Sequence, residues 1–321
     1  MPTTPRGEKL RPASWSELRD LTGIDAERTM PAEYARLVSP DANAPIAEAV
    51  RIERPRDPGP RAVDAHRPDW RAWSTRPHPG RRPRPPRLLH RGREVDPLWV
   101  WGADDRRIYF DPDHYPWSCV CRVVTESGVG SGVLIGPRHV LTASHCIDWD
   151  RLKIRVDVHC AGTYRLAHGW SRRVWRYTEI RQADAETVDE DYAIVELPEY
   201  LGDALGYMGA MTYESRWDDE PYWFNIGYPA DIAGGLYPTW QRDRRLDEDE
   251  IDYGGGRAMT TSADLTRGNS GGPMFGFFEG LPYVVAVVSA EGNGVFAGRE
   301  NYCAGGNDLT YLVKYVRANA P

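Results

Sequence analysis

The sequence predicts an all-β protein whose strands form a sandwich or a pair of barrels. Three observations indicate this fold class. From about Val100 onward, short apolar runs of strand length alternate with turns. Helical periodicity is scarce in that region until a C-terminal segment, Leu309–Arg317. The 321-residue chain also contains 12 Trp and 17 Tyr, which supply enough large side chains for a substantial core.

Charge divides the chain into three parts. Residues 1–50 carry 6 basic and 8 acidic side chains, for a net charge of −2. Residues 51–96 carry 13 Arg and 6 acidic side chains, or +7, and residues 97–321 carry 21 basic and 33 acidic side chains, or −12. The whole chain has a net charge of −7. We therefore expect a domain boundary near residue 96, followed by one domain over residues 97–321.

The first 50 residues are predicted to be a weakly helical extension. Ser14-Trp-Ser-Glu17 has the form of a capping box, and apolar residues follow it at helical spacing. Pro31–Val38 has the pattern of a second short helix with proline in its first turn. This is too little apolar surface for an independent core, so we expect the extension to dock on the rest of the protein or to be mobile.

Residues 51–96 are dominated by Arg and Pro, as in the run Pro79–Arg87. Such a composition favours extended conformations, and we interpret the segment as a linker or pro-segment. Nucleic-acid binding is disfavoured, because only Trp70 and Trp73 are suited to stacking on bases. The opposite charges of this segment and the following domain predict that the two make intramolecular contact, with the segment as the removable cover of a zymogen.

The predicted strands are separated by turns such as Gly136-Pro137 and Gly227-Tyr-Pro229. Cys119 and Cys121 are two residues apart, so on a strand they face the same way and are not expected to bond each other. In chain order the expected strands are Ser118–Val124, Gly132–Ile135, Val140–Thr142, Leu152–Val158, Ala193–Leu197, Trp223–Ile226 and Tyr283–Val288.

The strongest chemical signal is the run Gly268-Asn-Ser270-Gly-Gly-Pro. A serine becomes a nucleophile only when a base takes its proton, and it must lie on an exposed, tightly turned backbone. Glycines permit that turn because they tolerate positive φ. The same turn directs the N–H groups of Gly268 and Ser270 toward one point, the geometry that an oxyanion needs.

Two stretches upstream supply partners for that serine. A predicted strand, Val140–Thr142, leads into His145, and histidine is the side chain best suited to transfer a proton near neutral pH. Asp191 lies at the start of the strand that begins at Ala193, where a buried carboxylate can accept the imidazole N–H. Asp189 and Asp184 are alternatives. We favour Asp191 because the strand anchors it directly.

Together these stretches resemble the three catalytic blocks of chymotrypsin-like serine proteases, and most closely those of the bacterial glutamyl-endopeptidase branch. The blocks are Thr142–Cys146, Asp191–Val195 and Gly268–Pro273, in that order. Val100–Arg106 resembles the mature start of that branch. The resemblance covers roughly residues 100–318.

The resemblance implies two antiparallel six-stranded β-barrels followed by a C-terminal helix, with the active site between the barrels. Ser270 would then attack the carbonyl of a polypeptide substrate, His145 would transfer the proton, and Asp191 would orient His145. The N–H groups of Gly268 and Ser270 would form the oxyanion hole, and no metal or organic cofactor is implied. The alternative is a catalytically silent homologue that acts as a binding module.

Two positions depart from the pattern of the wider family. Asn269 stands where the trypsin branch has an aspartate that pairs with a new N-terminus, so trypsin-style activation is not expected. Gly130 stands where the family usually has the cysteine that bonds to the one after the catalytic histidine. The resemblance therefore leaves Cys146 to pair with Cys160 or to stay reduced.

Specificity is left open between a basic and a small or apolar residue. Ser289 resembles the residue that edges the specificity pocket, and Asp264 occupies the place where trypsin has its pocket-base aspartate. Val288 replaces the histidine of glutamyl enzymes, which argues against a preference for glutamate. The acidic run Asp247–Asp252 is interpreted as a solvated loop rather than a calcium site.

The cellular compartment is also left open. No apolar run approaches the roughly 18 residues that a membrane span requires, so we expect no membrane association. The N-terminus has no recognisable secretory signal, whereas the family resemblance implies a secreted protein. The five cysteines are too few to decide between a reducing and an oxidising environment.

Overall fold

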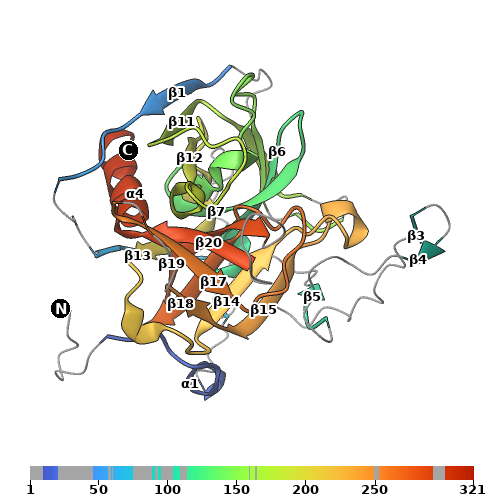
Figure 1. Cartoon of the computed structure of the whole chain (residues 1–321), viewed down its shortest axis with the longest axis vertical. Helices are drawn as coiled ribbons and strands as arrows, with labels where there is room; N and C mark the ends of the chain where they lie inside the picture. The colour runs from blue at the N-terminus through green and yellow to red at the C-terminus, as the bar shows by residue number, and fades with distance from the viewer. Residues whose placement is uncertain are drawn as a thin grey trace.

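Two curled, largely antiparallel sheets dominate the structure, which is a computed structural model (Figure 1). It describes residues 10–20, 46–56, 59, 61–74, 89–90, 93–94, 104–108, 114–158, 160–162, 165–248, 252, 254–291 and 301–321. The helices are short, except for one at the C-terminus. The all-β fold class with a C-terminal helix, expected from the sequence, is therefore confirmed.

The first sheet contains eight strands, of which seven come from one continuous part of the chain. These strands are β6 (Val120–Val124), β7 (Val129–Gly136), β8 (His139–Thr142), β9 (Arg155–Val158), β10 (Ala167–Trp170), β11 (Arg173–Arg176) and β12 (Ala193–Glu196), joined by β1 (Glu48–Arg51). Their spatial order is β1-β11-β12-β8-β7-β6-β9-β10. All neighbours are antiparallel except β1, which pairs in parallel with β11.

The second sheet contains ten strands. They are β2 (Ala62–Val63), β5 (Arg107–Ile108), β13 (Gly209–Met211), β14 (Trp223–Gly227), β15 (Thr239–Arg244), β16 (Leu246–Asp247), β17 (Gly256–Thr261), β18 (Pro273–Phe278), β19 (Leu281–Glu291) and β20 (Asn301–Gly306). The main order is β16-β17-β20-β19-β18-β14-β15-β5, and β13 joins through β19 and carries β2 on its other edge.

Short helices connect the strands, and a small hairpin of β3 (Leu89–His90) and β4 (Arg93–Glu94) completes the described elements. The α-helices are α1 (Trp15–Asp20), α3 (Leu201–Leu205) and α4 (Asn307–Asn319). The 3₁₀ turns are η1 (Trp117–Cys119), η2 (Ser144–Cys146), η3 (Val188–Glu190), η4 (Ser215–Trp217) and η5 (Ala233–Gly235). No helix in the described part of the chain is both long and apolar enough to cross a membrane.

Each of the seven strands expected from the sequence overlaps an observed strand. The sheets have more strands than the six per barrel implied by the family resemblance. Two of the additional strands, β1 and β2, come from residues 1–96, which we call the N-terminal extension from here on. The strands β5 and β16 are two-residue strands at the ends of the second sheet. The extension adds strands because an exposed sheet edge presents unpaired backbone groups that another segment can bond.

A cluster of aromatic rings fills the centre of the second sheet. The Trp117 ring lies 5.9 Å from the rings of Phe224 and Phe275 and 5.7 Å from that of Trp240, in edge-to-face contacts. Trp117 is fully buried. Such contacts bury large apolar areas and add about 0.5–1.5 kcal/mol per pair beyond burial.

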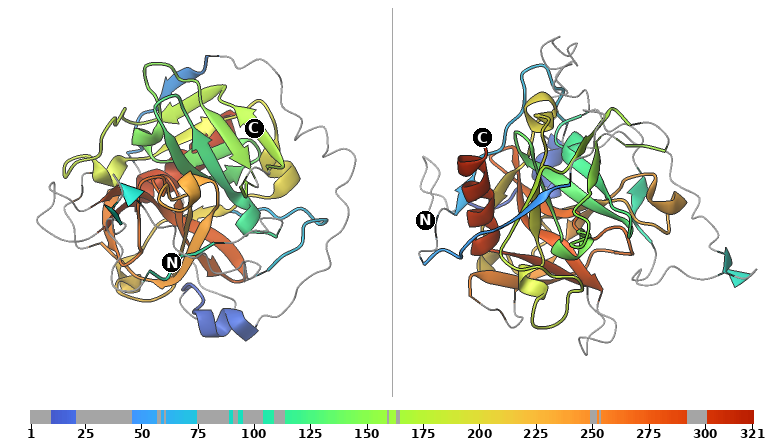
Figure 2. Two further views of the ribbon diagram at one scale, coloured as in Figure 1. Left: turned by 90° about the vertical axis from the view of Figure 1, so that its right-hand side faces the viewer. Right: turned by 90° about the horizontal axis from the view of Figure 1, so that it is seen from above.

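The first described segment docks through α1 on the second sheet, at the bottom of the left view in Figure 2. Ser14 and Glu17 form the capping box that the sequence predicts: Ser14 N–H donates to the Glu17 carboxylate at 2.7 Å, and Glu17 N–H donates to Ser14 Oγ at 3.5 Å. Leu18 is completely buried, and the Trp15 ring lies 6.1 Å from Phe224. The helix is therefore held by tertiary contacts.

Part of the predicted linker packs into the protein. After β1, the N–H of Ile52 donates to the Arg176 carbonyl at 2.9 Å, and the Ile52 side chain is buried. β2 pairs with β13, and Trp70 is buried as well, so its ring is not available to stack on bases. These residues of the predicted linker bury apolar side chains because they join a core that the two sheets have already formed.

Several sequence-based predictions lie outside the described residues. These are the helix at Pro31–Val38, the arginine–proline run Pro79–Arg87 and the boundary near residue 96. Two strands that precede the expected boundary are described: β1 pairs with β11 and β2 pairs with β13.

Replacement of Ile52 by Ala tests whether β1 and its continuation are part of the folded domain. The change removes a side chain that is only 6% exposed, so we expect the free energy of unfolding to fall by about 2–5 kcal/mol. Urea unfolding of the full chain measures this change. The matched control is Ile46→Ala, since Ile46 is 81% exposed and its loss should change stability by about 0.5 kcal/mol or less. Equal effects of the two changes would contradict the docking.

Candidate active site

The pairing of two buried strands brings His145 and Asp191 together. Thr142 at the end of β8 lies opposite Ala193 at the start of β12. His145 follows Thr142 by three residues, in η2, and Asp191 precedes Ala193 by two. Because β8 and β12 are antiparallel, the segments that extend beyond this register pair leave the sheet on the same side. The sequence could place each residue on its own strand but could not supply this register.

The Asp191 carboxylate accepts three hydrogen bonds and is fully buried. Its Oδ1 accepts the backbone N–H of His145 at 2.9 Å, and its Oδ2 lies 2.5 Å from His145 Nδ1. Ser289 Oγ donates to the same Oδ2 at 2.6 Å. A buried carboxylate is stable only when its oxygens are satisfied in this way.

The histidine is held in a polarised environment. Burial by itself lowers the pKa of His145, but attraction to the Asp191 carboxylate and the Cys146 sulfur, together with hydrogen bonds to both, outweighs it, so the pKa is raised well above the usual 6.5. The contact at Nδ1 leaves Nε2 as the nitrogen that can exchange a proton with another group. The side chain is 22% exposed, so a substrate can reach it.

The turn that carries Ser270 needs glycine at two positions. Gly268 has φ of +95°, and a Cβ there would collide with the Tyr228 carbonyl oxygen. Gly271 has φ of +79°, and a Cβ there would collide with Thr142 Oγ1 and the Ser131 carbonyl oxygen. Only glycine combines positive φ with so close an approach of neighbouring backbone. The glycine signal in the sequence therefore has a direct structural cause.

Ser131, on β7 of the first sheet, holds this turn in place through hydrogen bonds. Its N–H donates to the Ser270 carbonyl at 2.8 Å, and its Oγ donates to the Gly268 carbonyl at 2.6 Å. The same Oγ accepts the N–H of Tyr228 at 2.8 Å. The sequence analysis did not identify this residue. Its only local signal is a serine between two glycines, Gly130 and Gly132, on a buried strand.

The N–H groups of Gly268 and Ser270 form no intramolecular hydrogen bond within the described part of the chain. The preceding carbonyl, that of Arg267, is turned away and accepts the N–H of Ala230 at 2.6 Å. Two neighbouring N–H donors are therefore available to an external acceptor at the turn. Ser270 also lies beside η2, since its carbonyl accepts Cys146 Sγ at 3.4 Å.

Asp191 is the one of the three aspartate candidates in contact with His145 in the described structure. Asp184 is exposed and instead accepts the Thr187 hydroxyl at 2.7 Å. Asp189 is buried in η3 and lies against Gly256 of the second sheet.

The two residues predicted for the specificity pocket occupy different settings. Ser289 on β19 is buried and its hydroxyl binds Asp191. Asp264 is buried too, and both its backbone N–H and its carbonyl bond to the side chain of Gln241, at 2.7 and 2.8 Å. The pocket itself stays a prediction.

All five cysteines are free thiols, so of the two alternatives for Cys146 the structure has the reduced thiol and not the pairing with Cys160. A Cβ built on Gly130 would lie 2.7 Å from Cys146 Sγ. Gly130 therefore faces the Cys146 thiol, but it has no side chain that could bond to it. Cys160 is buried elsewhere, near the Val158 carbonyl, and burial raises the pKa of its thiol to about 12. Cys146 is therefore the thiol nearest the candidate site.

Asn269, next to the serine, is neutral, and a buried positive charge near the serine turn is that of Arg106. Asn269 is fully buried, and its Nδ2 donates to Asn225 Oδ1 at 3.5 Å. A buried cation, Arg106, bonds Thr266 Oγ1 at 3.2 Å and pairs with Asp231 at 2.5 Å and with Asp104 at 2.8 Å. This cluster ties the start of the serine turn to the segment before β5.

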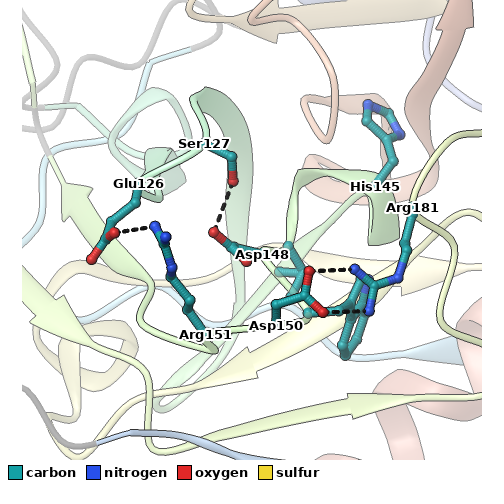
Figure 3. Close-up of a pocket in the computed structure, with 9 residues that line it drawn as sticks. Glu126, Ser127, His145, Asp148, Asp150, Arg151 and Arg181 are labelled. Atoms are coloured by element: carbon teal, nitrogen blue, oxygen red, sulfur yellow. Dashed lines mark hydrogen bonds and ion pairs between the residues drawn. The ribbon is translucent and has the colours of Figure 1, made fainter.

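A groove of about 480 Å³ opens beside His145 and is lined mainly by charged residues (Figure 3). Arg181 forms two hydrogen bonds of 2.9 Å with Asp150, Arg151 pairs with Glu126, and Ser127 Oγ donates to Asp148 at 3.0 Å. In the described residues, no cluster of three His, Cys, Asp or Glu side chains is arranged to hold a metal ion.

Comparisons with known proteins agree with the geometry. Residues 130–281 match the family described as the trypsin-like peptidase domain. The chain is 28% identical over 184 residues to a glutamyl endopeptidase of Bacillus licheniformis; the match covers 55% of this chain and 54% of that protein, so it spans about half the length of the relative.

Two solved structures share the fold. One is a Glu endopeptidase in complex with MPD, with a TM-score of 0.56, 16% identity, and coverage of 68% of this chain and 98% of that one. The other is the thermostable serine protease AL20 from an extremophilic microorganism, with a TM-score of 0.50, 16% identity, and coverage of 63% and 97%. Residues 130–281 are therefore similar in sequence to trypsin-like peptidase domains, the chain is similar to a glutamyl endopeptidase, and it shares the fold of these two solved proteases.

Proposed function

We propose that the protein is a serine endopeptidase that hydrolyses peptide bonds through Ser270, His145 and Asp191. The observation that carries the proposal is the buried contact between His145 Nδ1 and Asp191 Oδ2, beside a glycine turn that carries the serine. An imidazole whose Nδ1 is held by a carboxylate presents Nε2 as a base, which is what a serine nucleophile needs.

The reaction has two halves. In the first, Ser270 Oγ attacks the substrate carbonyl carbon while its proton passes to His145 Nε2, and the same proton then goes to the leaving amine as the C–N bond breaks. In the second, a water molecule gives a proton to His145 and attacks the acyl group, and the acid product leaves as Ser270 recovers its proton. Asp191 stabilises the imidazolium in both halves without being protonated.

The N–H groups of Gly268 and Ser270 would bind the oxyanion that develops in each half. Their freedom from intramolecular hydrogen bonds supports this role, because donors that are already oriented need no reorganisation when the negative charge forms. Removing one such donor in other enzymes costs about 10²–10³ in turnover. Ser131, which bonds the carbonyls of both residues, would keep them aligned.

The substrate is a polypeptide, as for the proteases that the chain resembles. The residue preference at the cleavage site stays between a basic and a small or apolar side chain, as the candidate pocket residues Asp264 and Ser289 indicate. Val288 is buried on β19 and cannot supply the charge or hydrogen bond that recognition of a glutamate side chain would need.

The assignment of the nucleophile is tested by labelling with a fluorophosphonate. We expect wild-type protein to be labelled and Ser270→Ala to be unlabelled, and we expect Ser270→Ala and His145→Ala each to lower turnover of a small ester by about 10⁴–10⁶-fold. Ser262→Ala, at an exposed serine, is the matched control. Equal labelling of the Ser270→Ala protein would rule out Ser270, and an unlabelled wild type would favour a silent homologue that acts as a binding module.

The choice of aspartate is tested by two isosteric changes. Asp191→Asn should lower turnover by about 10⁴-fold with the fold intact, because an amide favours the wrong imidazole tautomer. Asp189→Asn should be mild, since Asp189 lies against Gly256 rather than His145. Steady-state kinetics on the same ester compare the two, and the opposite order of severity would overturn the assignment.

The pH dependence follows from the raised pKa of His145. Only neutral imidazole can accept the serine proton, so activity falls as the pH drops through that pKa. We expect the acid limb of kcat/KM to have its midpoint above 6.5, the usual histidine value. Asp191→Asn removes the attraction that raises the pKa most, so the residual activity should have a lower midpoint. A midpoint below 6.5 in the wild type would contradict the His145 environment described above.

A further inference from the structure

Three carboxylates, those of Asp189, Glu190 and Asp308, lie close together next to the candidate active site. Asp189, Glu190 and Asp191 are consecutive, and Asp308 in the first turn of α4 joins them from the other end of the chain. All four are buried: Asp189 and Asp191 are at most 1% exposed, Asp308 is 4% exposed and Glu190 is 8% exposed. Buried like charges repel one another strongly and require a compensating cation.

Arg54 of the N-terminal extension faces this cluster. Its Nη2 forms an ion pair with Glu190 Oε2, and its Nε lies 4.0 Å from Asp308 Oδ2. The guanidinium also lies 5.9 Å from the centre of the Tyr177 ring. Thr178 Oγ1 donates to Glu190 at 3.3 Å.

The negative charges of Glu190 and Asp308 are stabilised by Arg54. Burial raises the pKa of Glu190 and of Asp308, and in each case Arg54 is the strongest influence in the opposite direction. One oxygen of each, Glu190 Oε1 and Asp308 Oδ2, has no hydrogen-bond partner in the described structure. Without Arg54 the charge on Glu190 would be buried uncompensated, and Glu190 would have to move toward solvent or take up a proton.

Glu190 is linked to Asp191 through the backbone. The two residues are adjacent, and the Glu190 carbonyl accepts the N–H of Tyr192 at 2.7 Å. The Tyr192 ring in turn packs edge-to-face on Tyr177, with ring centres 6.3 Å apart. The backbone on both sides of Asp191 is thus tied to groups that Arg54 touches.

Arg54 is itself held in place by the main chain. β1 pairs with β11 in a fixed register from Glu48 with Arg173 to Arg51 with Arg176. The two strands lie side by side at the top of Figure 1. The Ile52 N–H continues this pairing, and the buried Ile52 side chain anchors the segment two residues before Arg54. The arginine lies outside residues 130–281, the part that matches the peptidase family.

We propose that Arg54 is a positioning residue of the peptidase: through its ion pair with Glu190, the N-terminal extension holds Asp191 against His145. The proposal rests on the proposed function. If it is right, residues 46–56 are needed for full turnover. They would then support activity and would not act as an inhibitory cover.

The test compares ester hydrolysis by Arg54→Ala, Arg54→Gln and Arg54→Lys in the full chain. A misplacement of about 1 Å at a catalytic group can cost about 10²-fold, so we expect the first two changes to lower kcat by about 10–100-fold with little change in KM. Arg54→Lys keeps the charge and should recover most of the loss. Arg54→Gln keeps much of the side-chain length, so a folding defect of the alanine variant alone does not decide the result.

The control is Arg61→Ala, because Arg61 belongs to the same extension and pairs with Glu214 at 3.5 Å, away from Asp191. It should leave kcat unchanged. A second arm adds Glu190→Gln to Arg54→Ala, which removes the buried charge that lost its partner and should restore kcat at least tenfold relative to Arg54→Ala alone.

Equal kcat values for Arg54→Ala and Arg61→Ala, or no recovery from Glu190→Gln, would overturn the positioning role. An inactive and unlabelled wild type would instead overturn the proposed function itself. The two failures are therefore distinguishable in one set of measurements.

Discussion

The buried carboxylate of Asp191 is the constraint on which the candidate site depends. It accepts hydrogen bonds from the backbone and the ring of His145, both in the first half of the domain, and from Ser289 on β19 of the second sheet. An ionised group removed from water is tolerated only with such complete pairing. These hydrogen bonds therefore hold the imidazole ring and the loop that carries Asp191 in place. Through Ser289 they also connect the two sheets at this point.

A second set of polar contacts aligns the serine turn with that pair. Ser131 projects from β7 of the first sheet and bonds the carbonyls of Gly268 and Ser270 in the second half of the chain. Arg106 secures the start of the same turn through Thr266 and Asp231. Because each contact crosses between distant segments, the geometry of the site is a property of the whole domain rather than of the loop.

The N-terminal extension contributes to the same architecture. β1 and Ile52 extend the first sheet, β2 extends the second, and α1 covers aromatic residues of the second sheet through Leu18 and Trp15. The extension has a net positive charge after residue 50, and one of its arginines, Arg54, forms an ion pair with Glu190 in the buried acidic cluster. The charge contrast visible along the sequence therefore corresponds, at this position, to a specific ion pair.

From the sequence alone we predicted the fold class, seven strands that overlap observed ones, and the serine, histidine and aspartate of the proposed site, because each is encoded locally by alternation, turn glycines or a short motif. Only the tertiary structure decided the partners: Ser289 on Asp191, Ser131 under the serine turn, Cys146 facing a glycine instead of a cysteine, and Arg54 on Glu190. These contacts depend on strand register and on which edge of a sheet a distant segment occupies. Local spacing carries no information about either, since the pairing energy comes from residues far apart in the chain.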